Sequence, residues 1–314
     1  MQGDLSPESP ERRAEHGNVH ALGRLGPGAR AWEIVKRIAI GVYSDGFIHA
    51  GNLAFLALMT LFPFCIVTAA LAHFLGRGPE TMDAVASYLR ELPPSVRQVV
   101  KEPIADVLAQ RTGALLWLGG LVGLWTTASF IETIRDILRR SYGVSYVRSF
   151  WEYRLNSGAL VVASVLLTLA AFSAELLLSA VAEVVQRLLP FASGVLTWIG
   201  WTRAAPPVSL FVALYLLFYS LTPGKYRRSN CPKWPGALVT AFWWVTVATL
   251  LPRVLALLGG YGRTYGSLAG VVVTLIFFWL VGFGLVIGAQ LNAALAEPPE
   301  TSVREPEQPA SMED

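Results

Sequence analysis

Six long stretches of this chain, each of 19 residues or more, contain no Asp, Glu, Lys or Arg. A helix of about 20 apolar residues crosses the roughly 30 Å hydrocarbon core of a bilayer. Because hydrocarbon offers the backbone no hydrogen-bond partners, segments of this kind span it as α-helices. The pattern therefore predicts an all-α polytopic membrane protein with six transmembrane helices. The stretches are Gly46–Gly76, Thr112–Ile131, Leu155–Ala174, Ala204–Gly224, Trp234–Pro252 and Thr264–Ala296.

The same pattern divides the chain into three parts. Residues 32–297 are expected to form the transmembrane domain. Residues 1–31 and 298–314 are polar, contain Pro and several charges, and are expected to be disordered cytoplasmic tails. The expected spans are residues 50–75, 112–131, 155–181, 205–222, 235–258 and 265–296.

The connection between the first two spans is not a plain loop. Val85, Tyr88, Leu89 and Leu92 recur at helical spacing, and Pro93-Pro94 then interrupts the pattern before a second apolar series begins. Two short amphipathic helices are therefore expected on the outer side of the membrane.

Composition narrows the chemistry. The chain is 54% hydrophobic and 15% charged, against about 25% charged in an ordinary soluble domain. Its two cysteines and four scattered histidines do not suggest a disulfide framework or a metal site. The sequence also lacks a Walker-type loop, G-x-S-x-G and H-E-x-x-H. We therefore expect no metal, no cofactor, no catalytic residues and no enzymatic activity.

The basic residues are distributed unevenly among the polar connections. They are dense before the first span and after the second and fourth spans, although the connection 77–111 also carries five. Cytoplasmic loops are enriched in Lys and Arg, so both termini are expected in the cytoplasm. These side chains would meet anionic headgroups at about 1 kcal/mol each, while topology alone also explains their location. Those assigned to headgroup contact are Arg135, Arg139, Arg140, Lys225, Arg227 and Arg228.

Single-cysteine labelling with an impermeant reagent tests this topology. Cysteines placed at Ser145 and Ser229 are expected to react only from the cytoplasmic side, and those at Ser95 and Ser193 only from outside. Labelling of Ser229 from outside would contradict the arrangement, because the densest basic loop would then lie on the wrong side.

Polar residues inside the spans are costly in lipid and are therefore candidates for function. Four amides lie in the inner halves of the spans and would converge on a polar cavity open to the cytoplasm; alternatively, each bonds a neighbouring helix carbonyl. A proline in the first span frees a backbone carbonyl, which makes Thr60–Pro63 either part of a substrate pathway or a packing kink. The candidate pathway residues are Asn52, Thr60, Pro63, Asn156, Gln290 and Asn292.

Small residues recur at four-residue spacing in several spans. Such spacing allows close approach of helix backbones in lipid, where packing drives helix association. We expect these residues to pack the bundle. The pairs are Ala50 and Ala54, Gly119 and Gly123, Gly266 and Gly270, and Gly284 and Gly288.

Several short motifs carry a family resemblance. Ala50–Phe55 leads to Thr60-Leu61-Phe62-Pro63, and Tyr265–Leu268 runs on to Gly288-Ala289-Gln290-Leu291-Asn292. With Trp125–Ala128 and Pro235-Gly236-Ala237, these motifs resemble the YihY/BrkB family of bacterial inner-membrane proteins, long mislabelled as ribonuclease BN. The resemblance covers roughly Trp32 to Glu297 and implies six helices with cytoplasmic termini.

The chain departs from the family pattern at three positions. Thr60 stands where the family usually has Ser, and Arg139 stands where it has Asn. Gln290 replaces the usual Glu, which removes a titratable group. If that Glu couples transport to protons in relatives, Gln290 cannot take the same role in this chain, because an amide does not titrate.

The leading interpretation is a transporter or lipid translocase of the plasma membrane for an anionic or amphipathic substrate, because the inner amides, the Pro63 kink and the basic rim suit such a path. The alternative is a membrane scaffold for envelope-assembly partners. A membrane-embedded hydrolase lacks a nucleophile–base pair. Membrane lipids are the expected partners and nucleic acid is not, while a homo-oligomer is left open.

Overall fold

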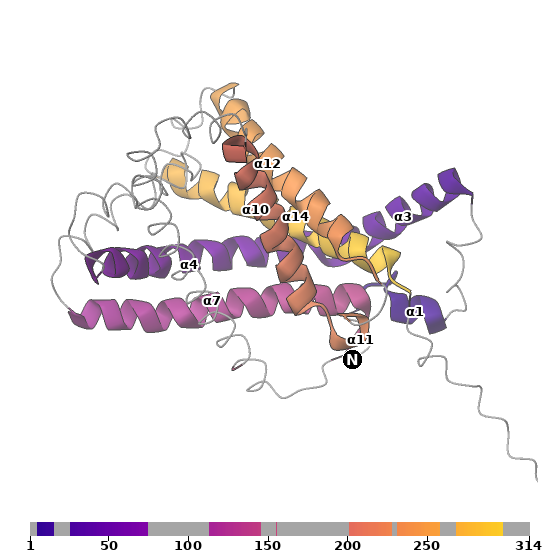
Figure 1. The fold of residues 1–314 in the computed structure, drawn as a ribbon, viewed down its shortest axis with the longest axis horizontal. Coiled ribbons are helices and arrows are strands. Elements are labelled where there is room, and N and C mark those ends of the chain that lie inside the picture. Colours follow the sequence, from indigo (N-terminus) through magenta and orange to yellow (C-terminus); the bar gives the residue numbers. More distant parts are fainter. Residues whose placement is uncertain are drawn as a thin grey trace, which may run out of the picture.

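The computed structural model describes residues 5–15, 26–74, 113–145, 155, 201–227, 231–257 and 268–297. Within these ranges every regular element is helical, as expected for an all-α protein (Figure 1). The expected third span and the outer amphipathic helices lie outside the described residues. The elements are α1 (Pro10–Glu15), α3 (Pro27–Gly41), the π-helix η1 (Val42–Gly46), α4 (Phe47–Phe74), α7 (Gly113–Tyr142), α10 (Trp201–Leu221), α11 (Gly224–Arg227), α12 (Trp234–Leu257) and α14 (Ala269–Leu295).

The long helices fall on the apolar stretches of the sequence. Among the described residues, α12 and α14 are long and apolar enough to cross a membrane, and Phe47–Leu61 and Pro207–Leu221 are shorter apolar helices. Helix α7 continues past the expected end at residue 131 to Tyr142. Its polar extension is helical because Asp136 pairs with Arg139 and Arg140 one turn later, at 2.7 Å each.

The N-terminal region differs from the disordered tail that composition predicts. Residues 10–15 form α1, and α3 already begins at Pro27. The Ser6 amide donates to the Arg140 carbonyl at 3.1 Å, and Ser9 and Arg13 are buried. Composition averages over the whole segment, whereas α1 is ordered by specific contacts with the end of α7 and with α14.

Helix α14 is the centre of the bundle and packs against α3, α4, α7 and α12. A β-carbon at Gly46 would lie 3.3 Å from Val286, and one at Gly282 would lie 3.2 Å from the Ala50 carbonyl. Going from residue 46 to residue 50, the contacts on α14 go back from residue 286 to residue 282. The segment η1–α4 and helix α14 are therefore antiparallel. The π-helix lies where this contact begins.

Glycines bring α12 and α14 into backbone contact. A β-carbon at Gly288 would overlap the Thr240 hydroxyl and lie 2.7 Å from the Gly236 carbonyl. Thr240 Oγ1 donates to the Gly284 carbonyl at 3.2 Å. The prediction that Gly284 and Gly288 pack the bundle is confirmed, since close approach of this kind holds helices together in lipid.

A second small-residue contact joins α4 to α7, which lie side by side (Figure 1). A β-carbon at Gly123 would lie 2.7 Å from the Pro63 β-carbon, and Pro63 is buried. The Thr60 hydroxyl donates to the Leu56 carbonyl within α4 at 2.7 Å. These contacts support the interpretation of Thr60–Pro63 as a packing kink.

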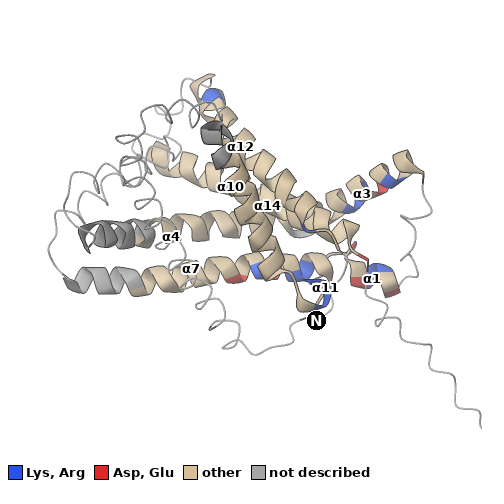
Figure 2. Cartoon of the chain, viewed as in Figure 1, with Lys and Arg blue, Asp and Glu red and all other residues tan. Residues whose placement is uncertain are grey.

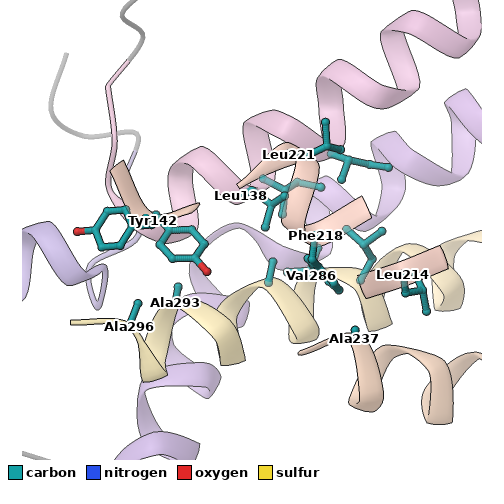
Figure 3. Close-up of a cluster of buried hydrophobic side chains, with 14 of the residues drawn as sticks. Leu138, Tyr142, Leu214, Phe218, Leu221, Ala237, Val286, Ala293 and Ala296 are labelled. Atoms are coloured by element: carbon teal, nitrogen blue, oxygen red, sulfur yellow. The ribbon is translucent and has the colours of Figure 1, made fainter. Parts of the chain in front are cut away.

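The buried apolar side chains gather around the C-terminal half of α14 (Figure 3). Two aromatic rings meet here: the ring centroids of Tyr142, at the end of α7, and Tyr226, on α11, lie 4.9 Å apart. This core lies directly beneath the polar end of the bundle. Its labelled members are Leu138, Tyr142, Leu214, Phe218, Leu221, Ala237, Val286, Ala293 and Ala296.

Candidate functional site

Buried polar groups are concentrated at one end of the bundle, which we call the polar end. Here α7 and α14 end, α12 begins, and α1 and α11 pack across them. Figure 2 shows many of the described Lys and Arg residues along α1, α3, α11 and the end of α7. Buried polar and charged residues at this end include Arg13, Arg37, Arg139, Thr222, Lys233, Gln290 and Asn292.

Asn292 joins the end of α14 to the start of α12. Its Oδ1 accepts from the Gly236 backbone N–H at 2.8 Å, and its Nδ2 donates to the Lys233 carbonyl at 3.1 Å. The first N–H groups of a helix have no partner within that helix. Asn292, which is fully buried, therefore caps α12 from another part of the chain.

Arg13 caps the other helix end in the same region. Its Nη2 donates to the carbonyls of Ala293, in the last turn of α14, and Ala296, just beyond the helix, at 2.9 and 3.0 Å. Carbonyls at a helix end lack the usual partners within the helix; that of Ala293 also accepts from the Ala296 N–H at 3.2 Å. A cation at this position also suits the partial negative charge of a helix C-terminus. Burial, followed by the charge of Arg37, lowers the pKa of Arg13 to about 10. The guanidinium is thus charged at neutral pH.

Glu11 attaches α1 to α11. Its carboxylate lies 2.8 Å from the Lys225 ammonium and accepts a 2.5 Å hydrogen bond from the Tyr226 hydroxyl. Burial, and then this bond to Glu11, raises the pKa of Tyr226 above 10.0. Burial likewise raises the pKa of Tyr142. Both phenols are neutral at physiological pH, so Tyr226 keeps the proton that it donates.

The basic residues assigned to headgroups are largely engaged within the protein. Arg139 and Arg140 bind Asp136, and Lys225 binds Glu11. Arg227 donates to the Ser220 carbonyl at 3.2 Å. Arg135 is half-buried, and Arg228 lies outside the described residues. Arg139 is moreover buried, so it is a structural residue of α7 rather than an open lipid contact.

Three of the four candidate amides lie among the described residues, and each has a different environment. Asn292 is buried against α12, whereas Asn52 is exposed on α4. Gln290 packs its amide against Gly41 at the end of α3, and Asn156 lies outside the described residues. Among the described residues, Asn52, Gln290 and Asn292 thus face different neighbours of α4 and α14, and the shared cavity stays a prediction.

The sequence pattern does not single out Glu11 and Arg13, because the composition of residues 1–31 predicts a disordered tail. A local signal did exist. Ser9 precedes Pro10 and Glu11, and Arg12 and Arg13 follow; a small polar residue before Pro, then an acidic and a basic residue, is typical of a short helix. Nothing local indicates that this helix would pack on α14.

A helical bundle with long apolar helices and one polar end has the architecture of an integral membrane protein. The family model described as Virulence factor BrkB matches residues 44–313, and the chain belongs to this family. The resemblance inferred from the motifs is thus confirmed.

Relatives support the same assignment. The chain is 30% identical over 257 residues to the putative ribonuclease-like protein YfkH of Bacillus subtilis, covering 80% of this chain and 90% of that protein. It is 25% identical over 267 residues to a UPF0761 membrane protein of Aeromonas salmonicida, covering 80% and 84%. A UPF0761 membrane protein of Neisseria meningitidis serogroup B is 24% identical over 269 residues, covering 85% of this chain and 63% of that protein. No solved structure matches.

Proposed function

We propose that this protein moves an anionic or amphipathic substrate across the bacterial plasma membrane, with the polar end and both termini in the cytoplasm. One observation carries the proposal: ionisable side chains are buried at one end of an apolar bundle, and a separate short helix, α1, binds across the end of α14 and α11 there. Buried ionisable groups in a membrane protein are expensive and mark substrate or ion pathways.

The contacts of α1 suit an element that opens and closes. Arg13 binds two backbone carbonyls, and Glu11 binds Lys225 and Tyr226. These are polar bonds that water can replace when α1 leaves, whereas separating α12 from α14 would break the glycine contacts of the core. We therefore assign α1 as the closing element at the cytoplasmic end.

Flux in reconstituted vesicles tests the proposal. A fluorescent phosphatidylglycerol analogue serves as the probe, and its movement between leaflets is followed by dithionite quenching. Glu11→Gln removes the ion pair to Lys225; such partly exposed pairs contribute up to about 1 kcal/mol. The expected result is flux up to about fivefold faster than in the unaltered protein. Glu15→Gln is the matched control, because Glu15 lies on the same helix and is exposed.

Two outcomes count against the proposal in different ways. Vesicles with the folded protein that move the probe no faster than empty vesicles would reject lipid transport. Flux that responds equally to Glu11→Gln and Glu15→Gln would reject α1 as the closing element and leave transport standing.

A second candidate function is a membrane scaffold for envelope-assembly partners. The contact between α12 and α14 favours it: Trp243 and Trp244 donate to the Leu280 and Val281 carbonyls at 2.8 Å each, and the glycines leave no room between the helices. A scaffold needs such a rigid bundle and no pathway. The vesicle experiment separates the two, since a scaffold gives no flux.

A further inference from the structure

The side of α3 that points away from α14 carries an apolar stripe. Its members lie three or four residues apart and are exposed, and we call them the outer stripe: Trp32, Val35, Ala39 and Tyr43. The opposite side of α3 holds a charged pair, in which the buried Arg37 donates from its Nε to Glu33 at 3.1 Å. A helix whose outer side meets water shows the reverse arrangement. The outer stripe therefore requires an apolar partner.

Exposed apolar side chains continue from the outer stripe onto α4. Phe47 and Ile48 at the start of α4 are exposed, and Phe55 and Met59 follow further along the helix. Helix α4 is the expected first span, whose exposed apolar side chains meet lipid. The outer stripe is thus continuous in sequence with a lipid-facing surface.

Contacts with α14 give the level of α3 along the bundle. A β-carbon at Gly41 would overlap the Gln290 side chain, near the end of α14. One turn earlier on α3, the charge of Arg37 lowers the pKa of Arg13, which binds carbonyls at the end of α14. Helix α3 therefore runs past the end of α14, and it extends away from the other long helices at its start (Figure 1).

The end of α14 is also the level at which the apolar bundle meets its polar end. Helix α12 begins here, where Asn292 accepts from the N–H of its third residue, and the adjacent Trp234 is 54% exposed. Exposed Trp and Tyr residues gather where hydrocarbon meets the headgroups. Trp234 and Trp32 thus mark the same boundary from two helices, and the outer stripe crosses it between Tyr43 and Trp32.

The exposed charges of α3 are both basic. Arg30 and Lys36 are exposed, whereas Glu33 is half-buried beside Arg37. Lys36 approaches Glu33 only to 3.9 Å and keeps 53% of its side chain exposed. A lysine at this position can lay its stem along apolar surface and extend its ammonium to the headgroups. The positive charge complements anionic lipid.

We propose that the outer stripe lies in the bilayer interface at the polar end, with Lys36 and Arg30 on the phosphates of anionic phospholipids. Amphipathic helices with aromatic and aliphatic side chains on one face and basic residues beside them bind in this way. A second copy of the chain would also cover the stripe, but it would bring the basic residues of two helices toward one another. The charges therefore favour the bilayer. The proposal does not depend on transport.

Photocrosslinking in vesicles tests the proposal. Benzoylphenylalanine replaces Val35 in the full-length protein, which is reconstituted into vesicles of equimolar phosphatidylglycerol and phosphatidylcholine and irradiated. Intact-mass spectrometry is expected to find lipid adducts, mainly of phosphatidylglycerol. The same label in place of Glu15 is the matched control. Glu15 is exposed on α1 at the same end of the bundle, and α1 has no apolar stripe, so no lipid adduct is expected.

The basic residues are tested in the protein labelled at Val35. Lys36→Gln is expected to lower the ratio of phosphatidylglycerol to phosphatidylcholine adducts by about fivefold, which corresponds to about 1 kcal/mol for one charge near an anionic surface. Arg253→Gln is the matched control, because Arg253 is exposed towards the other end of α12. Its ratio is expected to be unchanged.

Several outcomes would overturn the proposal. One is an equal yield of lipid adducts at Val35 and Glu15, or none at either. Another is a crosslinked dimer, which would identify a second copy as the occupant. Equal yields of the two lipids at Val35 would remove the headgroup contact. Thermal unfolding checks folding, and if the Val35 variant does not fold, the same label in place of Trp32, itself an exposed aromatic residue, decides in the same way. Lipid adducts without flux would reject the proposed function alone.

Discussion

Asn292→Leu is expected to destabilise the protein strongly, whatever its effect on transport. The Gly236 N–H would lose its partner at a fully buried position, and the Lys233 carbonyl would lose the second donor that Asn292 supplies. An orphaned buried group costs about 1–3 kcal/mol, which is the expected loss in the free energy of unfolding. Hydrogen bonds between membrane helices average only about 0.6 kcal/mol, but Asn292 satisfies a backbone N–H that has no partner within its own helix.

The matched substitution is Asn52→Leu, which removes the same amide from an exposed position on α4. Its expected change is within about 0.5 kcal/mol, as for other surface substitutions. Thermal and denaturant unfolding in detergent measures both variants. Similar unfolding midpoints for the two would contradict the assignment of Asn292 as a helix cap, as would an Asn292→Leu protein that loses flux and keeps its stability.

Gly288→Ala is expected to loosen the contact between α12 and α14. The added methyl would overlap the Thr240 hydroxyl and lie 2.7 Å from the Gly236 carbonyl. A threonine side chain rotates, but a backbone carbonyl held within a helix does not, so the helices must separate. Overpacking of this kind costs about 1–3 kcal/mol, and Gly288→Ile is expected to prevent folding.

Gly51→Ala is the control for this series. A β-carbon at Gly51 meets nothing within 4 Å, and replacing a helical Gly by Ala is favourable by about 0.5–1 kcal/mol. Unfolding measurements should therefore show opposite changes at Gly288 and Gly51. Two stabilised proteins would mean that α12 and α14 are further apart than the structure has them.

Sequence reasoning succeeded where the signal is local. The uncharged stretches anticipate α12 and α14, because a helix in lipid must be long and apolar. The spacing of Gly284 and Gly288 anticipates close packing, because residues four apart share one face. Both properties belong to a single segment and need no knowledge of its neighbours.

The amides show where such reasoning stops. Asn52 and Asn292 are the same residue type at similar expected depth, yet one is exposed and the other caps a helix. Their roles depend on which helix lies beside each of them, and no spacing in the sequence encodes that. Arg139 is similar: the uncharged stretch that ends at residue 131 predicts a connection here, but Arg139 lies inside α7 and binds Asp136.

The bonds from Arg13 to α14 also constrain the order in which the molecule assembles. They join residues 280 and 283 positions apart, so they cannot form until the last helix has been synthesised and inserted. The contacts of the same segment with Arg140, Lys225 and Tyr226 involve residues made earlier, and contacts of the longest sequence separation form late. The bonds from Arg13 therefore report that the bundle is complete, and a chain interrupted before Ala293 would lack this part of the binding site for α1.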